Sequence, residues 1–290
     1  KTGRFSFLLG GRLDKNSEID DPIFSPRLNI RYNPIPDLSL RASYSEGFRA
    51  PQTYDEDLHV AAVGGEVTLI QVAKDLKTER SRSYSASVDY YTAWGPVQIN
   101  LLLEGFYTSL HNPFVLEEIE SDDENKILKR RNGSDAVVKG FNLEGKIAPH
   151  KSVQLQFGAT LQNSKYDEPV AWSKDPDVEA CRKLLRSPDQ YGYATLNLLP
   201  FKNCSAALSG TYTGSLYVGH SAGYIETDVL EKTDSFFAAT IKLAYDIKVG
   251  RGYTLQLNLC LQNVFASYQN AFDKRDFRTS GSLSRPGFPR

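Results

Sequence analysis

Alternation of apolar and polar residues with a period of two is the feature that most constrains how this chain can fold. Between residues 151 and 163, apolar side chains occupy every second position: Val153, Leu155, Phe157, Ala159 and Leu161. The positions between them are polar or small. The same period recurs over residues 38–45, 82–91 and 253–262. Because successive side chains of a strand point to opposite faces, each segment predicts a strand with one apolar and one polar face.

The connections between the alternating segments are short and long in turn. Strands are expected over residues 5–13, 27–33, 38–45, 81–93, 97–107, 137–148, 152–163, 191–199, 204–214, 236–248 and 253–265. Tight turns fall near residues 35, 95, 150, 201 and 250. Long polar loops cover residues 46–80, 109–135, 164–190, 216–234 and 266–284, with a short helix expected near 177–185. Short turns at one end and long loops at the other are typical of an outer-membrane barrel.

Composition agrees with strands that cross a membrane. No run in the 290 residues approaches 18 apolar positions, which excludes a transmembrane helix. A barrel strand needs only about 9–11 residues, half of them polar, so the mean hydropathy of −0.40 is compatible with one. We therefore expect an all-β, antiparallel up-and-down transmembrane β-barrel segment of about twelve strands, the last truncated after Pro286. The net charge of −1 and the scattered Lys and Arg predict no nucleic-acid partner.

Aromatic residues, 16 Tyr and 15 Phe in all, gather near the expected strand ends. An amphipathic ring suits the boundary between lipid and water, so they predict girdles around a barrel. The alternative is the high strand propensity of tyrosine. The residues expected in girdles are Tyr90, Tyr91, Trp94, Phe106, Tyr107, Tyr191, Tyr193, Phe236 and Phe237.

One segment is recognisable beyond its period. Residues 38–58 read LSLRASYSEGFRAPQTYDEDL, and they contain a GFRAP motif made of Gly47, Phe48, Arg49, Ala50 and Pro51. This motif resembles the one in TonB-dependent outer-membrane receptors. The GFNLEG phrase at 140–145 and the strand at 257–265 agree, and phrases at 186–192 and 212–214 are similar to Bacteroidetes-type members. Within the motif we expect Gly47 to relieve a tight contact and Pro51 to end the strand. Shaping of a loop entrance by Arg49 and Pro51 is the alternative.

The resemblance implies a barrel of about twenty-two strands filled by an N-terminal plug domain. Residues 1–290 are then expected to be the C-terminal part of that barrel, without the plug. The implied function is energy-coupled uptake of an iron–siderophore or haem complex through the outer membrane of a Gram-negative bacterium, with cobalamin or another nutrient as the alternative. The implied partners are outer-membrane lipid, the nutrient, the missing plug and barrel half, and TonB acting through the plug. Two open strand edges predict that the isolated segment depends on detergent, self-association or non-native pairing.

Aromatic side chains in the loops are the expected ligand contacts, because their faces suit large flat or apolar-rimmed ligands. They are Tyr54, Tyr166, Trp172, Tyr217 and Tyr224. The acidic run over residues 117–124 either attracts a cation or an iron complex or is a solvated loop. Inward polar residues are expected to bond the plug and neighbouring strands: Glu104, Asn142, Glu144, Lys146, Asn258 and Gln262. The four His and three Cys show no metal-ligand spacing and no disulfide framework, so no metal or cofactor is expected.

Two alternatives come from other classes. A complete barrel hydrolase of about twelve strands suits the length, and Ser221 beside His220 is its one suggestive pair. Neighbouring residues of a strand point in opposite directions, which counts against that pair, and no enzyme activity is expected. A soluble adhesin-like β domain is the other alternative, and it would be monodisperse without detergent.

Overall fold

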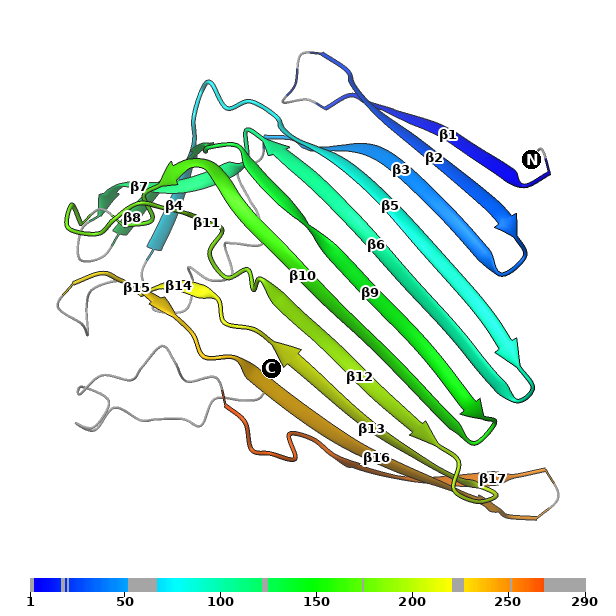
Figure 1. Ribbon diagram of the computed structural model, residues 1–290. Coiled ribbons are helices and arrows are strands. Elements are labelled where there is room, and N and C mark those ends of the chain that lie inside the picture. Colours follow the sequence, from blue (N-terminus) through cyan, green and yellow to red (C-terminus); the bar gives the residue numbers. More distant parts are fainter. Residues whose placement is uncertain are drawn as a thin grey trace, which may run out of the picture.

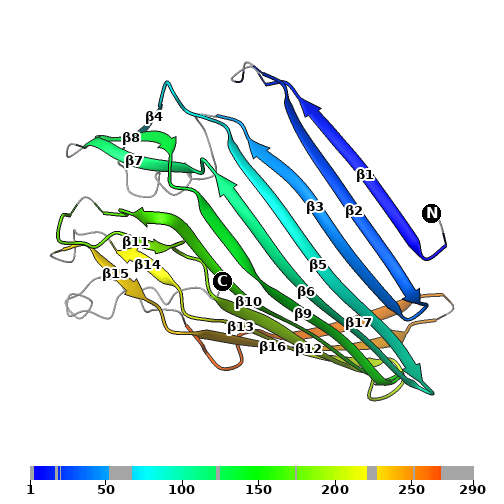
Figure 2. The ribbon, with the colours of Figure 1, turned by 45° about the horizontal axis from the view of Figure 1, so that its top comes forward.

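One large antiparallel sheet dominates the computed structural model, which describes residues 3–16, 19, 21–51, 67–121, 125–173, 175–220, 227–250 and 252–268. Its strands are β1 (Phe5–Asp14), β2 (Ile23–Ile35), β3 (Leu38–Arg49), β5 (Glu79–Trp94), β6 (Val97–His111), β9 (Ala136–His150), β10 (Val153–Val170), β11 (Cys181–Lys183), β12 (Gln190–Leu198), β13 (Cys204–Thr213), β16 (Phe236–Lys248) and β17 (Thr254–Leu261). The order is β1-β2-β3-β5-β6-β9-β10-β12-β13-β16-β17, with β11 paired to β10 beside this path. The sheet is thus an up-and-down meander, as predicted (Figure 1). Seen from a second angle, it curves into an open trough (Figure 2).

Smaller sheets stand at the end of the trough where the long connections lie (Figure 1). The strands β4 (Val67–Val72), β7 (Phe114–Ser121) and β8 (Asn125–Asn132) form a three-stranded sheet in the order β4-β8-β7, with β4 parallel to β8. The strands β14 (Tyr217–His220) and β15 (Val229–Lys232) form a hairpin. The segments expected as long polar loops therefore carry secondary structure of their own.

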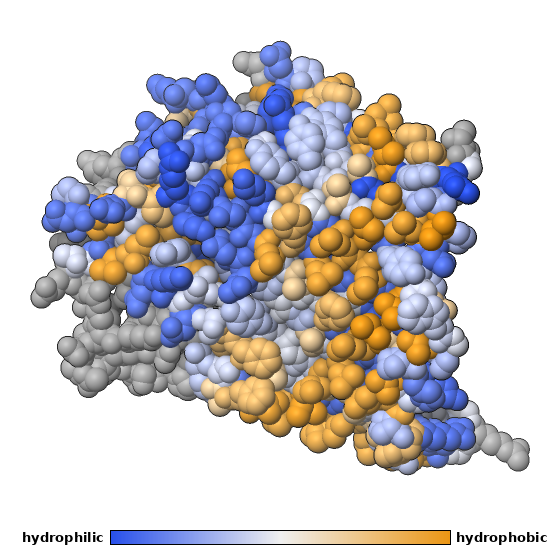
Figure 3. All heavy atoms as spheres, viewed as in Figure 1, coloured by the Kyte–Doolittle hydropathy of each residue, from blue (hydrophilic) through white to orange (hydrophobic). Residues whose placement is uncertain are grey.

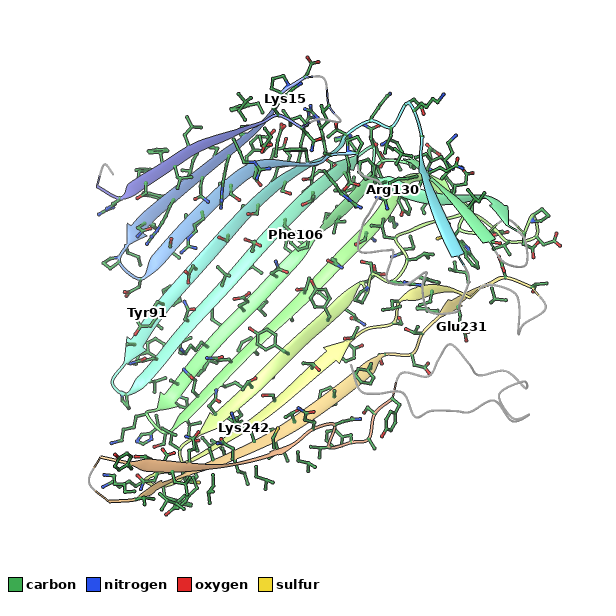
Figure 4. All side chains as sticks on the ribbon, turned by 180° about the vertical axis from the view of Figure 1, so that it is seen from behind. Lys15, Tyr91, Phe106, Arg130, Glu231 and Lys242 are labelled. Carbon is green, nitrogen blue, oxygen red and sulfur yellow. The ribbon has the colours of Figure 1, made fainter. Side chains whose placement is uncertain are left out.

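The pairing register gives the large sheet one apolar face and one polar face. Residues Leu40, Val88, Leu103, Leu143 and Ala159 lie opposite one another on successive strands of the apolar face. One position further along the strands, the polar face carries Arg41, Ser87, Glu104, Asn142 and Thr160. Figure 3 shows the apolar residues as a band across the strands. Figure 4 views the sheet from behind, where Tyr91, Phe106 and Lys242 are labelled.

The apolar face is exposed rather than packed into a core. Leu103 and Leu143 keep 51% and 41% of their surface exposed, and among the described residues the buried apolar ones are few: Ile23, Ala73, Ala136, Val218 and Ala239. A soluble protein of this size buries its large apolar side chains. The exposed band therefore requires a partner surface, which is the condition of a barrel strand in lipid. The described residues contain no helix of the length and apolarity needed to cross a membrane.

Side chains of the polar face bond across the strands. The Asn142 Nδ2 group donates to Glu104 Oε1 at 3.1 Å, and Thr160 Oγ1 donates to Asn142 Oδ1 at 2.9 Å. The Asn100 Nδ2 group donates to Asp89 Oδ1 at 2.7 Å. These bonds satisfy polar groups on the trough side of the sheet, as expected for Glu104 and Asn142.

One expectation about local structure is wrong, and another holds only in part. The expected helix near residues 177–185 is a turn followed by the short strand β11, because Leu184 N–H donates to Ser164 O and Lys183 pairs with Lys165 of β10. The expected girdle aromatics divide between the two faces. Those that share the polar face are Tyr91, Phe106, Tyr191, Tyr193 and Phe236. Pairs such as Tyr90-Tyr91 cannot both face outward, because adjacent strand residues point in opposite directions. The truncated strand after Pro286 lies outside the described residues.

Close approach of β9 and β10 predicts that Gly140 resists substitution. A Cβ atom at Gly140 would lie 2.2 Å from the Leu161 carbonyl oxygen, whereas one at Gly10 would meet nothing within 4 Å. We expect Gly140→Ala to lower the free energy of unfolding by about 1–3 kcal/mol and Gly10→Ala to change it by less than about 0.5 kcal/mol. Urea unfolding in detergent, followed by the electrophoretic mobility of the folded barrel, measures both. Equal effects of the two substitutions would contradict the close approach.

Candidate functional site

The candidate site lies at the loop end of β10, where the large sheet meets the long connections. Tyr166 pairs there with Ala136 of β9, Trp172 follows the strand, and β11 returns antiparallel to β10 so that Cys181 pairs with Val170. A cavity of about 390 Å³ lies between these segments. Its lining is Val115, Tyr166, Val170, Ala171, Trp172, Cys181, Lys183, Leu184 and Leu185. Two of the five predicted ligand residues, Tyr166 and Trp172, are therefore in one cavity.

Trp172 is held in place by the β14–β15 hairpin. A Cβ atom at Gly219 would lie 2.5 Å from Trp172 Cε3, so the indole packs directly on the backbone of β14. The Trp172 Nε1 atom is buried and has no hydrogen-bond partner within the described part of the chain. An unpaired buried donor costs free energy, and a ligand acceptor that reached it would recover that cost.

The polar groups of the cavity carry little net charge. Burial raises the pKa of Tyr166, and the nearby Cys181 thiol raises it further, so the phenol stays neutral. The Lys183 ammonium forms an ion pair with Asp189 at 2.7 Å. The Cys181 thiol donates to the Lys183 carbonyl oxygen at 3.4 Å. Walls that combine apolar side chains with neutral donors suit a flat group that carries acceptor atoms.

The other predicted ligand residues have different placements. Tyr217 is on β14, where its carbonyl accepts from Arg186 N–H at 2.8 Å and its ring centroid lies 6.0 Å from Lys232 Nζ. It shares a face of β14 with Gly219 but does not line the cavity. Tyr54 and Tyr224 lie outside the described residues.

The GFRAP motif joins the large sheet to the three-stranded sheet. Gly47, Phe48 and Arg49 end β3, and Ala50 and Pro51 follow it. A Cβ atom at Gly47 would lie 2.9 Å from Ser81 Oγ, which agrees with the expected close contact. The Arg49 guanidinium lies 5.1 Å from the ring centroid of Phe114, the first residue of β7. The two side chains form a cation–π contact.

The Asn132 side chain joins two of the long connections by hydrogen bonds, and the sequence analysis did not predict this role. Its side-chain amide donates to Lys77 O and accepts from Lys77 N–H, both at 2.8 Å, and it also donates to Asn112 O at 2.9 Å. The amide thus pairs with the Lys77 backbone as a neighbouring strand would. Only the non-local fold brings residues 55 positions apart together, so no local sequence signal marks this role.

Asp135 secures the base of the β7–β8 hairpin. It accepts from Asn112 N–H at 2.8 Å, and His111 Nδ1 lies 2.8 Å from its other oxygen. Burial opposes ionisation of Asp135, but these two hydrogen bonds outweigh it, so its pKa lies below the usual range. In the acidic run, Glu117 forms an ion pair with Arg131 across the hairpin, which gives this residue a structural role.

The lowered pKa predicts that acid loosens this hairpin. A carboxylate with a depressed pKa stabilises the folded state above the unfolded pKa of about 3.9, and that contribution disappears as the pH falls through the folded value. Hydrogen-exchange protection of residues 112–121 should therefore fall on acidification below about pH 4. In Asp135→Asn, protection should be lower at neutral pH and independent of pH in this range. Asp167→Asn should behave like the wild type, and an identical response of all three proteins would contradict the assignment.

Known proteins share this architecture. Residues 1–259 match the family model described as TonB dependent receptor-like, beta-barrel. Among similar solved structures, the FrpB iron transporter from Neisseria meningitidis (F3-3 variant) has a TM-score of 0.64 and 17% identity, covering 94% of this chain and 41% of its own. The siderophore receptor PirA from Acinetobacter baumannii has a TM-score of 0.64, 16% identity and coverages of 91% and 40%. The ferric enterobactin receptor PfeA from Pseudomonas aeruginosa has a TM-score of 0.62, 15% identity and coverages of 91% and 38%.

These likenesses concern the fold. At 15–17% identity they show a shared architecture, and this chain spans about two fifths of the length of each of the three. A comparison with curated proteins gives no match. Among the described residues, no group of three or more His, Cys, Asp or Glu side chains could hold a metal ion.

The family consists of receptors and not enzymes, which removes the hydrolase alternative. With a barrel match over residues 1–259 and the corresponding meander of strands, the chain belongs to the TonB-dependent receptors.

Proposed function

We propose that residues 1–290 form the C-terminal part of the barrel of an outer-membrane receptor that takes up an iron–siderophore or haem complex. The observation that carries this proposal is the two-faced sheet of a TonB-dependent receptor. Its exposed apolar band suits lipid, and its polar face suits a wet interior. The names of the similar structures, an iron transporter, a siderophore receptor and a ferric enterobactin receptor, favour an iron complex over cobalamin or another nutrient.

The partners follow from the surfaces of the sheet. Lipid of the outer membrane of a Gram-negative bacterium would cover the apolar face, and a plug domain would occupy the trough. The strand order of the described residues ends at β1 and β17, so these two edges would pair with the rest of the barrel. TonB would act through the plug. The Bacteroidetes type remains a prediction from residues 186–192 and 212–214.

The ligand would first meet the aromatic groups of the long connections. The cavity of Tyr166 and Trp172, at about 390 Å³, is near the lower limit for small-molecule pockets and suits one flat arm of a larger chelate. The Trp172 indole would contact that arm. Tyr54, Tyr217 and Tyr224 remain proposed contacts for the rest of the ligand.

Uptake by whole cells tests the function. A strain that lacks the gene is complemented with it and grown under iron limitation, with single siderophores or haem as the iron source. The proposal predicts that one of these compounds supports growth only with the gene and only with functional TonB. Restoration of cobalamin uptake instead would establish the alternative cargo, and restoration without TonB would contradict the proposal.

The two tryptophans of the sequence provide a matched pair for the binding site. Trp172 lines the cavity, whereas Trp94 is 70% exposed beside a short turn at the other end of the sheet. We expect Trp172→Leu to weaken ligand binding about tenfold or more, as loss of an aromatic anchor does, and Trp94→Leu to leave binding unchanged. Titration of the ligand with the purified receptor measures both, and unchanged affinity in Trp172→Leu would remove this cavity from the binding site.

A further inference from the structure

Basic side chains gather on the apolar face of the sheet at its loop end. We name this group the rim cations, and it consists of Arg80, Arg82, Lys139 and Lys165. On β5, exposed residues of the apolar face alternate with residues of the polar face, and Arg80 and Arg82 continue the exposed series beyond Tyr84. The pairings Tyr107–Lys139 and Val137–Lys165 place the two lysines on the same face. All four side chains are exposed.

A row of tyrosines lies directly beside the rim cations. Tyr44, Tyr84 and Tyr107 are cross-strand neighbours, with ring centroids 5.0 Å apart for the first pair and 6.4 Å apart for the second. Lys139 extends this row on the next strand. Interfacial tyrosines mark the level where hydrocarbon gives way to headgroups. Figure 3 shows the apolar band passing into hydrophilic surface toward this end.

The charge at this level is positive on balance. Arg82 forms an ion pair with Glu46 at 3.4 Å, whereas Arg80, Lys139 and Lys165 form no ion pair within the described part of the chain. On this face at the same level, the carboxylates of the described residues are those of Glu46, Asp135 and Asp167.

The spacing of the cations suits phosphate groups. Lys139 and Lys165 are diagonal neighbours on β9 and β10, about 7–8 Å apart, so both ammonium groups can reach one phosphate. Arg82 lies three strands from Lys165, a span of about 14 Å at an interstrand spacing of about 4.8 Å. The surface therefore has room for more than one phosphate.

We propose that the rim cations bind the phosphate groups of lipid headgroups in the membrane leaflet at the loop end of the barrel. This inference rests on the proposed position of the sheet in a membrane and is independent of the nutrient. Bound lipid would fix the depth of the barrel through the tyrosine row and neutralise the excess positive charge.

Lipid binding in detergent tests the proposal. The receptor is expressed in a Gram-negative host, purified, and titrated with phosphatidic acid or phosphatidylcholine while native mass spectrometry counts bound lipids. The proposal predicts preferential retention of phosphatidic acid. In Lys139→Gln/Lys165→Gln the apparent dissociation constant for this lipid should rise about tenfold or more.

Three controls make the outcome unambiguous. Lys151→Gln/Lys202→Gln removes the same charge from exposed residues of the short turns and should bind phosphatidic acid like the wild type. Lys139→Arg/Lys165→Arg keeps the charge and should also bind it, which separates charge from folding.

Equal losses in both Gln pairs, or no preference for phosphatidic acid, would overturn the proposal. Competition by millimolar inorganic phosphate would show a free-anion site and would also overturn it. Nutrient uptake is measured in parallel, so its failure with lipid selectivity intact would count against the proposed function alone.

Discussion

Backbone hydrogen bonding between antiparallel neighbours keeps the apolar side chains of this chain on one surface. The register is continuous from β3 through β5, β6 and β9 to β10, so Leu40 and Leu143 share a face although about a hundred residues separate them. A shift of one residue in any pair would turn a whole strand over and place its polar side chains in the apolar band. Because the described residues bury little apolar surface among themselves, this register depends on a partner that covers the band.

The structure at the loop end depends on the same register. β10 continues from its pair Tyr166–Ala136 with β9 to Val170, so that Tyr166 and Trp172 come to line one cavity. Arg49, Asn132 and Asp135 attach the three-stranded sheet to the ends of β3 and β6. The cavity walls are therefore held by strands and hydrogen bonds, which preorganises them for a ligand. The same strands bring Lys139 and Lys165 together on the outer face.

Local periodicity was sufficient to predict the large sheet from the sequence. The strands of the meander, their two faces and the tight turns near residues 35, 95, 150, 201 and 250 all follow from alternation and from Pro and Gly. Strict use of the same period would also have placed Phe106 and Tyr107 on opposite faces. The girdle prediction failed for about half of its residues because it used aromatic composition without the strand register.

The candidate site was less accessible to such reasoning. Tyr166 and Trp172 were predicted because they are loop aromatics, but their shared cavity depends on the return of β11 along β10. That pairing replaces the helix expected after Pro176. The edge of β10 offers backbone hydrogen-bond partners to β11, whereas a short isolated helix is only marginally stable. The parallel pairing of β4 with β8 joins residues 67–72 to 125–130, a contact with no local sequence signal. Non-local pairing thus decides what the long connections become.

The central claim is that adjacent residues of one strand face lipid and the barrel interior. Leu102 and Leu103 of β6 test it, because one lies on the polar face and the other is 51% exposed on the apolar face. Cysteine is introduced at each position in a background that lacks the three native cysteines, and a spin label is attached to the receptor in lipid bilayers. The account predicts that dissolved oxygen, which partitions into lipid, relaxes the label at position 103 and that a water-soluble nickel complex has greater access at position 102. Equal access at both positions, or the reverse order, would contradict it.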